Sequence, residues 1–175
     1  MVNSEPENLD WRLWRVVYQA YTRFKICLDQ VFADQGLTSE QYQVLAATKY
    51  RDAPVRITDV ALWLERSTNS VSMLVDRMVK VGLIRRVRDR KDRRVVNVFL
   101  TSKGEKAFKP ATVAARKAAQ QIMGSLSQKD KHSFVSLSDM INYKLLQYLN
   151  PEADTEAILK NDIKRRDTLL KRWLK

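Results

Sequence analysis

A dense cluster of guanidinium and ammonium groups occupies residues 85–94 of this 175-residue chain. Seven of these ten residues are Arg or Lys, and only Asp89 and Asp92 oppose them. Such a concentration of cations can neutralise several phosphate groups of a nucleic acid backbone. The alternative is a solvated charged turn, which has no need for so many guanidinium groups. The cluster therefore favours a phosphate-binding surface.

The cations stand between two segments with the residue types of β-strands. Leu83–Val87 and Val95–Leu100 are rich in branched apolar residues, and polar residues join them. Two such runs predict a β-hairpin. We expect its contacts with DNA to come from Arg88, Arg90, Lys91, Arg93 and Arg94. Asp92 would repel phosphate, so we interpret it as an intramolecular partner that orients Arg94.

A second candidate surface lies directly before the hairpin, in residues 67–80. The apolar residues of this segment fall on one helical face and are expected to pack inward: Val71, Leu74, Val75 and Met78. The other face begins with small polar residues, which can approach base edges in the major groove. The predicted contacts on this face are Thr68, Asn69, Ser70, Ser72, Met73 and Arg77. Taken alone, the segment is better interpreted as an ordinary amphipathic helix with a solvated face. The adjacent cationic hairpin reverses this interpretation and favours DNA recognition.

Further helices are predicted on both sides of these two elements. Apolar spacing indicates helices over 9–32, from Thr38 or Ser39 to about Tyr50, and over 59–65 with Thr58 as its cap, after a short strand at 55–57. Three more helices are expected over 102–123, 128–149 and 155–174. The expected fold class is mainly α with a small β-hairpin wing. It is a winged helix-turn-helix flanked by N- and C-terminal dimerisation helices.

This order suggests four parts within one domain. Residues 1–36 form an N-terminal dimerisation helix, and residues 37–101 form the winged helix-turn-helix DNA-binding domain. Residues 102–150 form C-terminal dimerisation helices, and residues 151–175 add an amphipathic helix. The excess apolar surface of the flanking helices predicts a homodimer.

Composition narrows the function classes. The net charge of +12 favours an anionic partner, with double-stranded DNA ahead of a membrane. One Cys and one His cannot form the usual soft-ligand metal sites from a single chain, and no nucleophile–base pair or phosphate loop stands out. We therefore expect no metal, no cofactor and no enzymatic activity. The polar, acidic start and the lack of a long apolar run predict a cytoplasmic protein with no membrane partner.

The aromatic residues of the flanking helices allow two interpretations. Trp14, Tyr18, Tyr42 and Trp63 could line a pocket for a small aromatic or apolar effector. They could instead fill the core and the dimer interface. Cys27 lies in the apolar stripe of the first helix, so we interpret it as a packing residue rather than an oxidation sensor.

The chain resembles the MarR family of bacterial transcriptional regulators. Asp92-Arg93-Arg94, Leu100-Thr101 and Gly104 fit the family's wing signature D-x-R-x-x-x-x-x-L-T-x-x-G. The resemblance implies a homodimer that binds a pseudo-palindromic promoter site, usually released by a small ligand or an oxidant. It also implies that Arg90 and Arg94 are the wing contacts and that Asp92 holds Arg94.

We therefore interpret the chain as a sequence-specific DNA-binding transcriptional regulator, most consistent with a repressor. One alternative is an effector-independent DNA-binding protein of the same fold. The other is a protein-interaction module whose cationic wing binds an acidic protein.

Overall fold

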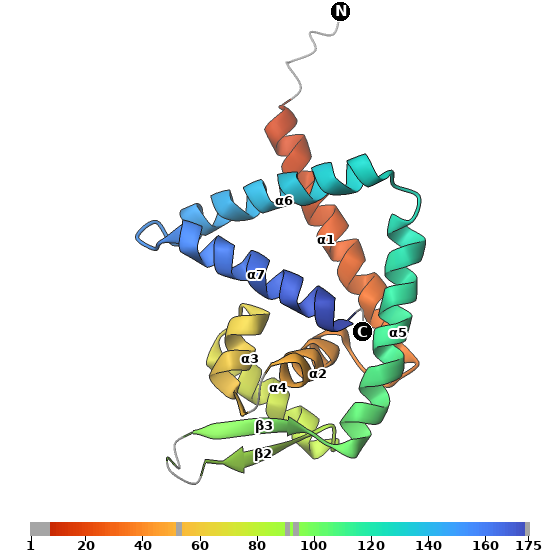
Figure 1. Cartoon of the computed structure of the whole chain (residues 1–175), viewed down its shortest axis with the longest axis vertical. Helices are drawn as coiled ribbons and strands as arrows, with labels where there is room; N and C mark the ends of the chain where they lie inside the picture. The colour runs from red at the N-terminus through yellow and green to blue at the C-terminus, as the bar shows by residue number, and fades with distance from the viewer. Residues whose placement is uncertain (1–7, 52–53, 90–91, 93–94, 174–175) are drawn as a thin grey trace, which may run out of the picture. The chain divides into compact units, whose positions relative to one another are not determined.

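The computed structural model of the chain describes residues 8–51, 54–89, 92 and 95–173. The secondary structure is mostly helical, with one small sheet (Figure 1). In chain order the elements are α1 (Leu9–Ala33), α2 (Ser39–Tyr50), β1 (Val55–Arg56), α3 (Ile57–Leu64), α4 (Thr68–Lys80), β2 (Ile84–Arg88), β3 (Val96–Leu100), α5 (Ser102–Met123), α6 (Gln128–Leu149) and α7 (Thr155–Trp173). The predicted fold class, a mainly helical chain with a winged helix-turn-helix, is confirmed.

The chain divides into two compact units, residues 1–118 and 119–175. The first unit contains α1 to α4, the three strands and most of α5. The second contains the end of α5 together with α6 and α7. The four-part division expected at residues 36, 101 and 150 stays a prediction.

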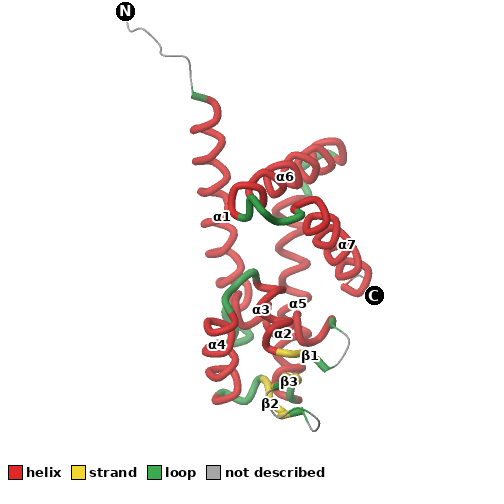
Figure 2. Tube along the Cα trace, turned by 90° about the vertical axis from the view of Figure 1, so that its left-hand side faces the viewer, coloured by secondary structure: helices red, strands yellow, loops and turns green. Residues whose placement is uncertain are grey.

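The sheet of the first unit is antiparallel, with β3 between β1 and β2 (Figure 2). The hairpin strands β2 and β3 pair from Ile84 opposite Leu100 to Arg88 opposite Val96. Arg86 lies opposite Val98, and paired residues project from the same face of a sheet. Because Val98 is fully buried, Arg86 projects towards the helices that cover this face.

The core of the first unit lies between α2, α3, α4 and the sheet. The inward face predicted for α4 is confirmed, since Val71, Leu74, Val75 and Met78 are all buried. Three aromatic rings extend this core to α1 and α5. The ring of Tyr42 stacks on Phe32 at a centroid distance of 4.2 Å and on Phe108 at 5.3 Å.

The start of α3 differs from the prediction. We expected Thr58 to cap a helix over 59–65, but α3 begins at Ile57. The carboxylate of Asp59 accepts a hydrogen bond from the backbone N–H of Arg56 at 2.9 Å. The prediction was wrong because a side chain inside the first turn reaches back to the preceding amide, so the cap does not need a hydroxyl before the helix.

The residues of the Leu-Thr-x-x-Gly pattern join the hairpin to α5. The hydroxyl of Thr101 donates to the carbonyl oxygens of Gly82 at 2.6 Å and Leu83 at 3.1 Å, and it accepts from the backbone N–H of Gly104 at 3.0 Å. A Cβ added at Gly104 would lie 2.1 Å from the carbonyl oxygen of Leu83. The residues of this pattern therefore pack the start of α5 against the chain segment that precedes β2.

Two helices expose wide apolar surfaces. Within the described chain, Phe32 is the only buried residue of α1, and α6 has none. The exposed apolar side chains of α1 include Leu9, Trp11, Leu13, Trp14, Val16, Val17, Tyr18, Tyr21, Phe24 and Ile26. Those of α6 include Phe134, Val135, Leu137, Met140, Leu145, Tyr148 and Leu149. None of the described helices is both long enough and apolar enough to cross a membrane.

In the second unit, α7 runs back beside α6 (Figure 1). The guanidinium of Arg166 binds both carboxylate oxygens of Asp139, at 2.7 and 3.0 Å. The hydrogen bond from Arg166 is the main reason that the pKa of Asp139 is lowered. This bidentate pair fixes α7 against α6.

Replacing Gly104 with Ala is expected to lower the free energy of unfolding by about 1–3 kcal/mol or more, because the backbone must move to relieve the contact with Leu83. Thermal or urea unfolding followed by circular dichroism measures the loss. Gly36→Ala is the control. Its Cβ would meet nothing within 4 Å, and only the positive φ of 65° would be strained. A loss for Gly104→Ala no larger than for Gly36→Ala would contradict the packing role.

Candidate nucleic-acid interface

The polar face of α4 is open to solvent over its first half. Ser67 caps the helix, because its hydroxyl oxygen accepts a hydrogen bond from the backbone N–H of Ser70 at 3.2 Å. Five of the predicted contact residues are exposed: Thr68, Asn69, Ser70, Met73 and Arg77. The apolar side chain of Met73 is 67% exposed, a position suited to contact with a thymine methyl group.

The sixth residue, Ser72, has a different environment. It is half-buried, and both its hydroxyl and its carbonyl oxygen accept hydrogen bonds from Nη2 of Arg86, at 2.9 and 3.0 Å. Nη1 of Arg86 lies 2.8 Å from the carboxylate of Asp76, one turn further along α4. Arg86 therefore joins the first wing strand to two turns of α4, and the Ser72 hydroxyl is already engaged within the chain.

The sequence did not predict that Arg86 binds α4, because Arg86 belongs to the cationic run of residues 85–94. A signal was present in the sequence. Strand side chains alternate between the two faces, so Arg86 shares the face of the apolar Ile84. An arginine at an inward position of a strand points to a partner on a covering element.

The wing, meaning residues 84–100, is described in part. Arg88 is exposed at the end of β2. The contacts predicted for Arg90, Lys91, Arg93 and Arg94, and the pairing of Asp92 with Arg94, lie outside the described residues. The backbone N–H of Asp92 donates to the carboxylate of Asp89 at 3.2 Å, and the N–H of Asp89 donates to the carbonyl oxygen of Val95 at 2.9 Å. Asp89 thus helps to close the turn.

The outer face of the wing carries another arginine. The guanidinium of Arg85 lies over the ring of Phe99, 4.7 Å from its centroid. This cation–π contact leaves the side chain exposed while it limits its motion. The arginines of β2 therefore divide between a clamp on α4, Arg86, and the exposed cations Arg85 and Arg88.

Two of the four residues predicted to line an effector pocket, Trp14 and Tyr42, lie far apart within one chain. Tyr42 lies in the aromatic core, where burial raises its pKa to about 12, while Trp14 and Tyr18 are 60% and 68% exposed. Trp14 precedes Phe32, the α1 contact of Tyr42, by 18 residues, which is about 27 Å along a helix. Trp63 is half-buried on α3.

A groove of about 710 Å³ lies elsewhere, in the second unit. It follows α6 from Gln128 to Tyr143, and Leu159 of α7 forms part of its wall. Cys27 is half-buried on α1. Within the described ranges, no cluster of three or more His, Cys, Asp or Glu residues could hold a metal ion.

Comparison with known proteins identifies the family. The MarR family profile matches residues 35–95. The chain is 33% identical to the transcriptional regulator MgrA of Staphylococcus aureus over 128 residues, which cover 73% of this chain and 85% of MgrA. It is 32% identical to the regulator TtmR of Methylorubrum extorquens and 34% identical to the repressor MdtR of Bacillus subtilis, matching 58% and 48% of this chain. The chain spans about half the length of these two relatives, 51% and 53%.

Solved structures share the fold. The organohalide-sensing regulator RdhR-CbdbA1625 in its 2,4-dichlorophenol-bound form superposes with a TM-score of 0.75 at 20% identity, covering 89% of this chain and 94% of that one. The MepR–DNA complex of S. aureus superposes with a TM-score of 0.65 at 25% identity, covering 74% and 94%. The chain belongs to the MarR family of winged-helix transcriptional regulators.

Replacing Arg86 with Ala is expected to lower the free energy of unfolding by about 1–2 kcal/mol, because Ser72 and Asp76 lose a charged hydrogen-bond partner. Chemical denaturation measures the change. Arg85→Ala removes the same charge from the neighbouring position and should cost clearly less, since its guanidinium is exposed above Phe99. Equal losses in the two variants would contradict the clamp.

Proposed function

We propose that this protein is a sequence-specific regulator that reads its DNA site with α4 and grips the backbone with the wing. One observation carries the proposal: the clamp of Arg86 on Ser72 and Asp76 holds the exposed face of α4 beside the cationic hairpin. Small polar residues at the start of α4 suit base edges, and the wing arginines suit phosphates. The likeness to MepR, whose solved structure is a DNA complex, supports the same use of the fold.

A homodimer is the second part of the proposal. The apolar side chains of α1 and α6 are exposed in a single chain and need a partner to cover them. A second copy of the chain supplies the same two surfaces, as a two-fold interface requires. Two copies of α4 would then enter successive major grooves of a pseudo-palindromic site, with half-sites about 10 base pairs apart.

The finer parts of the proposal are repression and release by an effector. The similarity to MdtR, named a transcriptional repressor, supports repression. A small aromatic effector is supported by the fold shared with RdhR-CbdbA1625, solved with 2,4-dichlorophenol, and by the exposed aromatic side chains of α1. The effector would act by favouring dimers whose α4 helices are wrongly spaced for the site.

DNA recognition can be tested at two residues. Arg88→Ala should weaken binding to a selected operator and to scrambled DNA alike and reduce the salt slope by about 0.9. Asn69→Ala should weaken the operator complex by about 1–3 kcal/mol and leave binding to scrambled DNA unchanged. Fluorescence anisotropy titrations at several salt concentrations measure both. Lys129→Ala, which removes an exposed charge from α6, is the control.

Equal affinity of the unsubstituted protein for operator and scrambled DNA at about 0.15 M salt would exclude sequence-specific reading. Binding to an acidic protein together with no measurable DNA affinity would establish the wing as a protein-interaction surface instead.

The dimer can be tested on α1. Leu13→Glu should shift the protein towards the monomer and weaken operator binding by roughly tenfold or more, because a charge would be buried without a partner in the interface. Sedimentation velocity measures the mass. Gln19→Glu adds the same charge at an exposed polar position of α1 and should leave the dimer intact. A Leu13→Glu protein that sediments as the unsubstituted protein does would refute this use of α1.

A further inference from the structure

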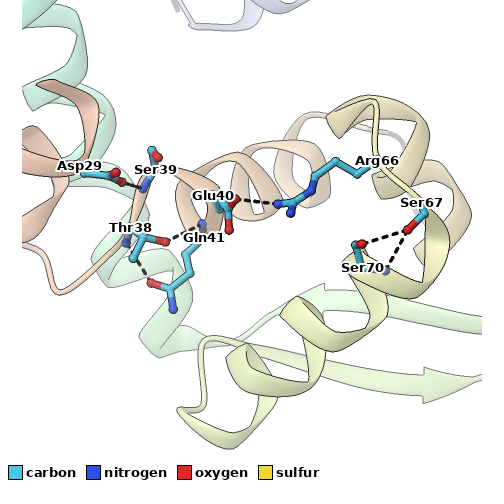
Figure 3. A network of polar contacts seen from close by, with 8 residues as sticks. All are labelled: Asp29, Thr38, Ser39, Glu40, Gln41, Arg66, Ser67 and Ser70. Carbon is cyan, nitrogen blue, oxygen red and sulfur yellow. Dashed lines mark hydrogen bonds and ion pairs between the residues drawn. The ribbon is translucent and has the colours of Figure 1, made fainter. Parts of the chain in front are cut away.

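The N-terminus of α2 is bonded to α1 on one side. The backbone N–H of Ser39 donates to the carboxylate of Asp29 at 2.7 Å, although ten residues separate the two in the chain (Figure 3). Interactions with the Ser39 hydroxyl and then with its backbone amide lower the pKa of Asp29. Ser39 is itself buried, so the bond is protected from solvent on the side of α2. This contact fixes α1 against the first turn of α2.

The next residue of α2 is bonded to the turn between α3 and α4. The carboxylate of Glu40 lies 2.7 Å from Nη1 of Arg66 (Figure 3). The backbone of this turn is hydrogen-bonded to α3, since the N–H of Arg66 donates to the carbonyl oxygen of Ala61 at 3.0 Å. The ion pair therefore connects two backbone segments that are each held in place.

Arg66 directly precedes the cap of α4. The hydroxyl of Ser67 accepts from the backbone N–H of Ser70 at 3.2 Å and donates to the hydroxyl of Ser70 at 2.9 Å. The residues proposed to contact bases begin one position later, at Thr68. A displacement of Arg66 thus displaces the end of α4 that enters the groove.

We propose that Glu40 is a positioning residue for DNA reading: through Arg66 it fixes the N-terminus of α4 relative to α2, and through its neighbour Ser39 relative to α1. The inference rests on the proposed function and adds a residue that does not touch DNA. Ser39 and Glu40 are neighbours in the first turn of α2. Through them, α2 is linked both to α1, which is proposed to form the dimer, and to α4, which is proposed to read the bases.

The ion pair acts on geometry more than on stability. Both side chains are partly exposed, at 40% for Arg66 and 37% for Glu40, and such pairs contribute little to folding. Base contacts, in contrast, depend on the placement of short polar side chains. Loss of the pair should therefore appear in the ratio of specific to non-specific affinity rather than in the unfolding temperature.

A purely electrostatic role for Glu40 predicts a different result, so the two roles can be distinguished. Neutralising Glu40 removes a negative charge and frees Arg66, so affinity for any DNA should rise without a change in base preference. A positioning role predicts that Glu40→Gln lowers the ratio of operator affinity to scrambled-DNA affinity by about two- to fivefold. Anisotropy titrations with the full-length protein measure this ratio.

Two further variants complete a double-mutant cycle. If Glu40 acts through Arg66, then Glu40→Gln, Arg66→Gln and the double variant should lower the ratio to a similar extent, because each breaks the same link. Additive losses would mean that the two residues act independently and would refute the link. Glu156→Gln is the matched control, since Glu156 has the same second position in α7 that Glu40 has in α2. It should leave the ratio unchanged.

The outcomes separate this proposal from the proposed function. A specificity ratio in Glu40→Gln equal to that of a specifically binding unsubstituted protein would overturn the positioning role alone. Equal affinities of the unsubstituted protein for both DNA fragments would refute the proposed function and this proposal with it.

Discussion

The burial of one face of α4 is the constraint on which the rest of the structure depends. Val71, Val75 and Met78 are fully buried, and each such side chain contributes about 1.5–3 kcal/mol relative to an exposed one. The helical period couples the two faces, so burying this stripe determines which side chains point outward. A rotation of one residue, about 100°, would carry polar side chains into the core and core side chains to the outside. The recognition proposed for α4 would therefore depend directly on how its core face packs.

Features that depend on local chain geometry could be predicted from the sequence. The two hairpin strands, the inward face of α4 and the helices on either side agree with the expected segments to within a few residues. The caps at Thr38, Ser67 and Ser127 also follow from nearby residues, since each hydroxyl oxygen accepts from an amide three positions on. Hydrophobic period and capping act over a single turn, so a sequence displays them without knowledge of the fold.

Features that depend on how elements meet could not be predicted in this way. To predict the partner of Arg86, one would have to know that α4 packs on β2. To predict the aromatic stack of Tyr42, one would have to know that α1 and α5 both contact α2. The effector pocket predicted from residue types is a second example of this limit. Trp14 and Tyr42 have suitable side chains, but their place in the fold separates them within one chain. Residue type indicates what a site could bind, whereas long-range packing decides which residues share it.

The exposed length of α1 has a consequence for the energetics of the free subunit. Beyond its last two turns, this helix contributes few contacts to its own chain, since Phe32 is its one buried residue in the described structure. An isolated helix is only marginally stable in water, so the first turns of α1 gain most of their order from whatever covers them. If a second subunit does so, folding of this segment and assembly become one equilibrium. The fraction of ordered α1 would then rise with the concentration of the protein.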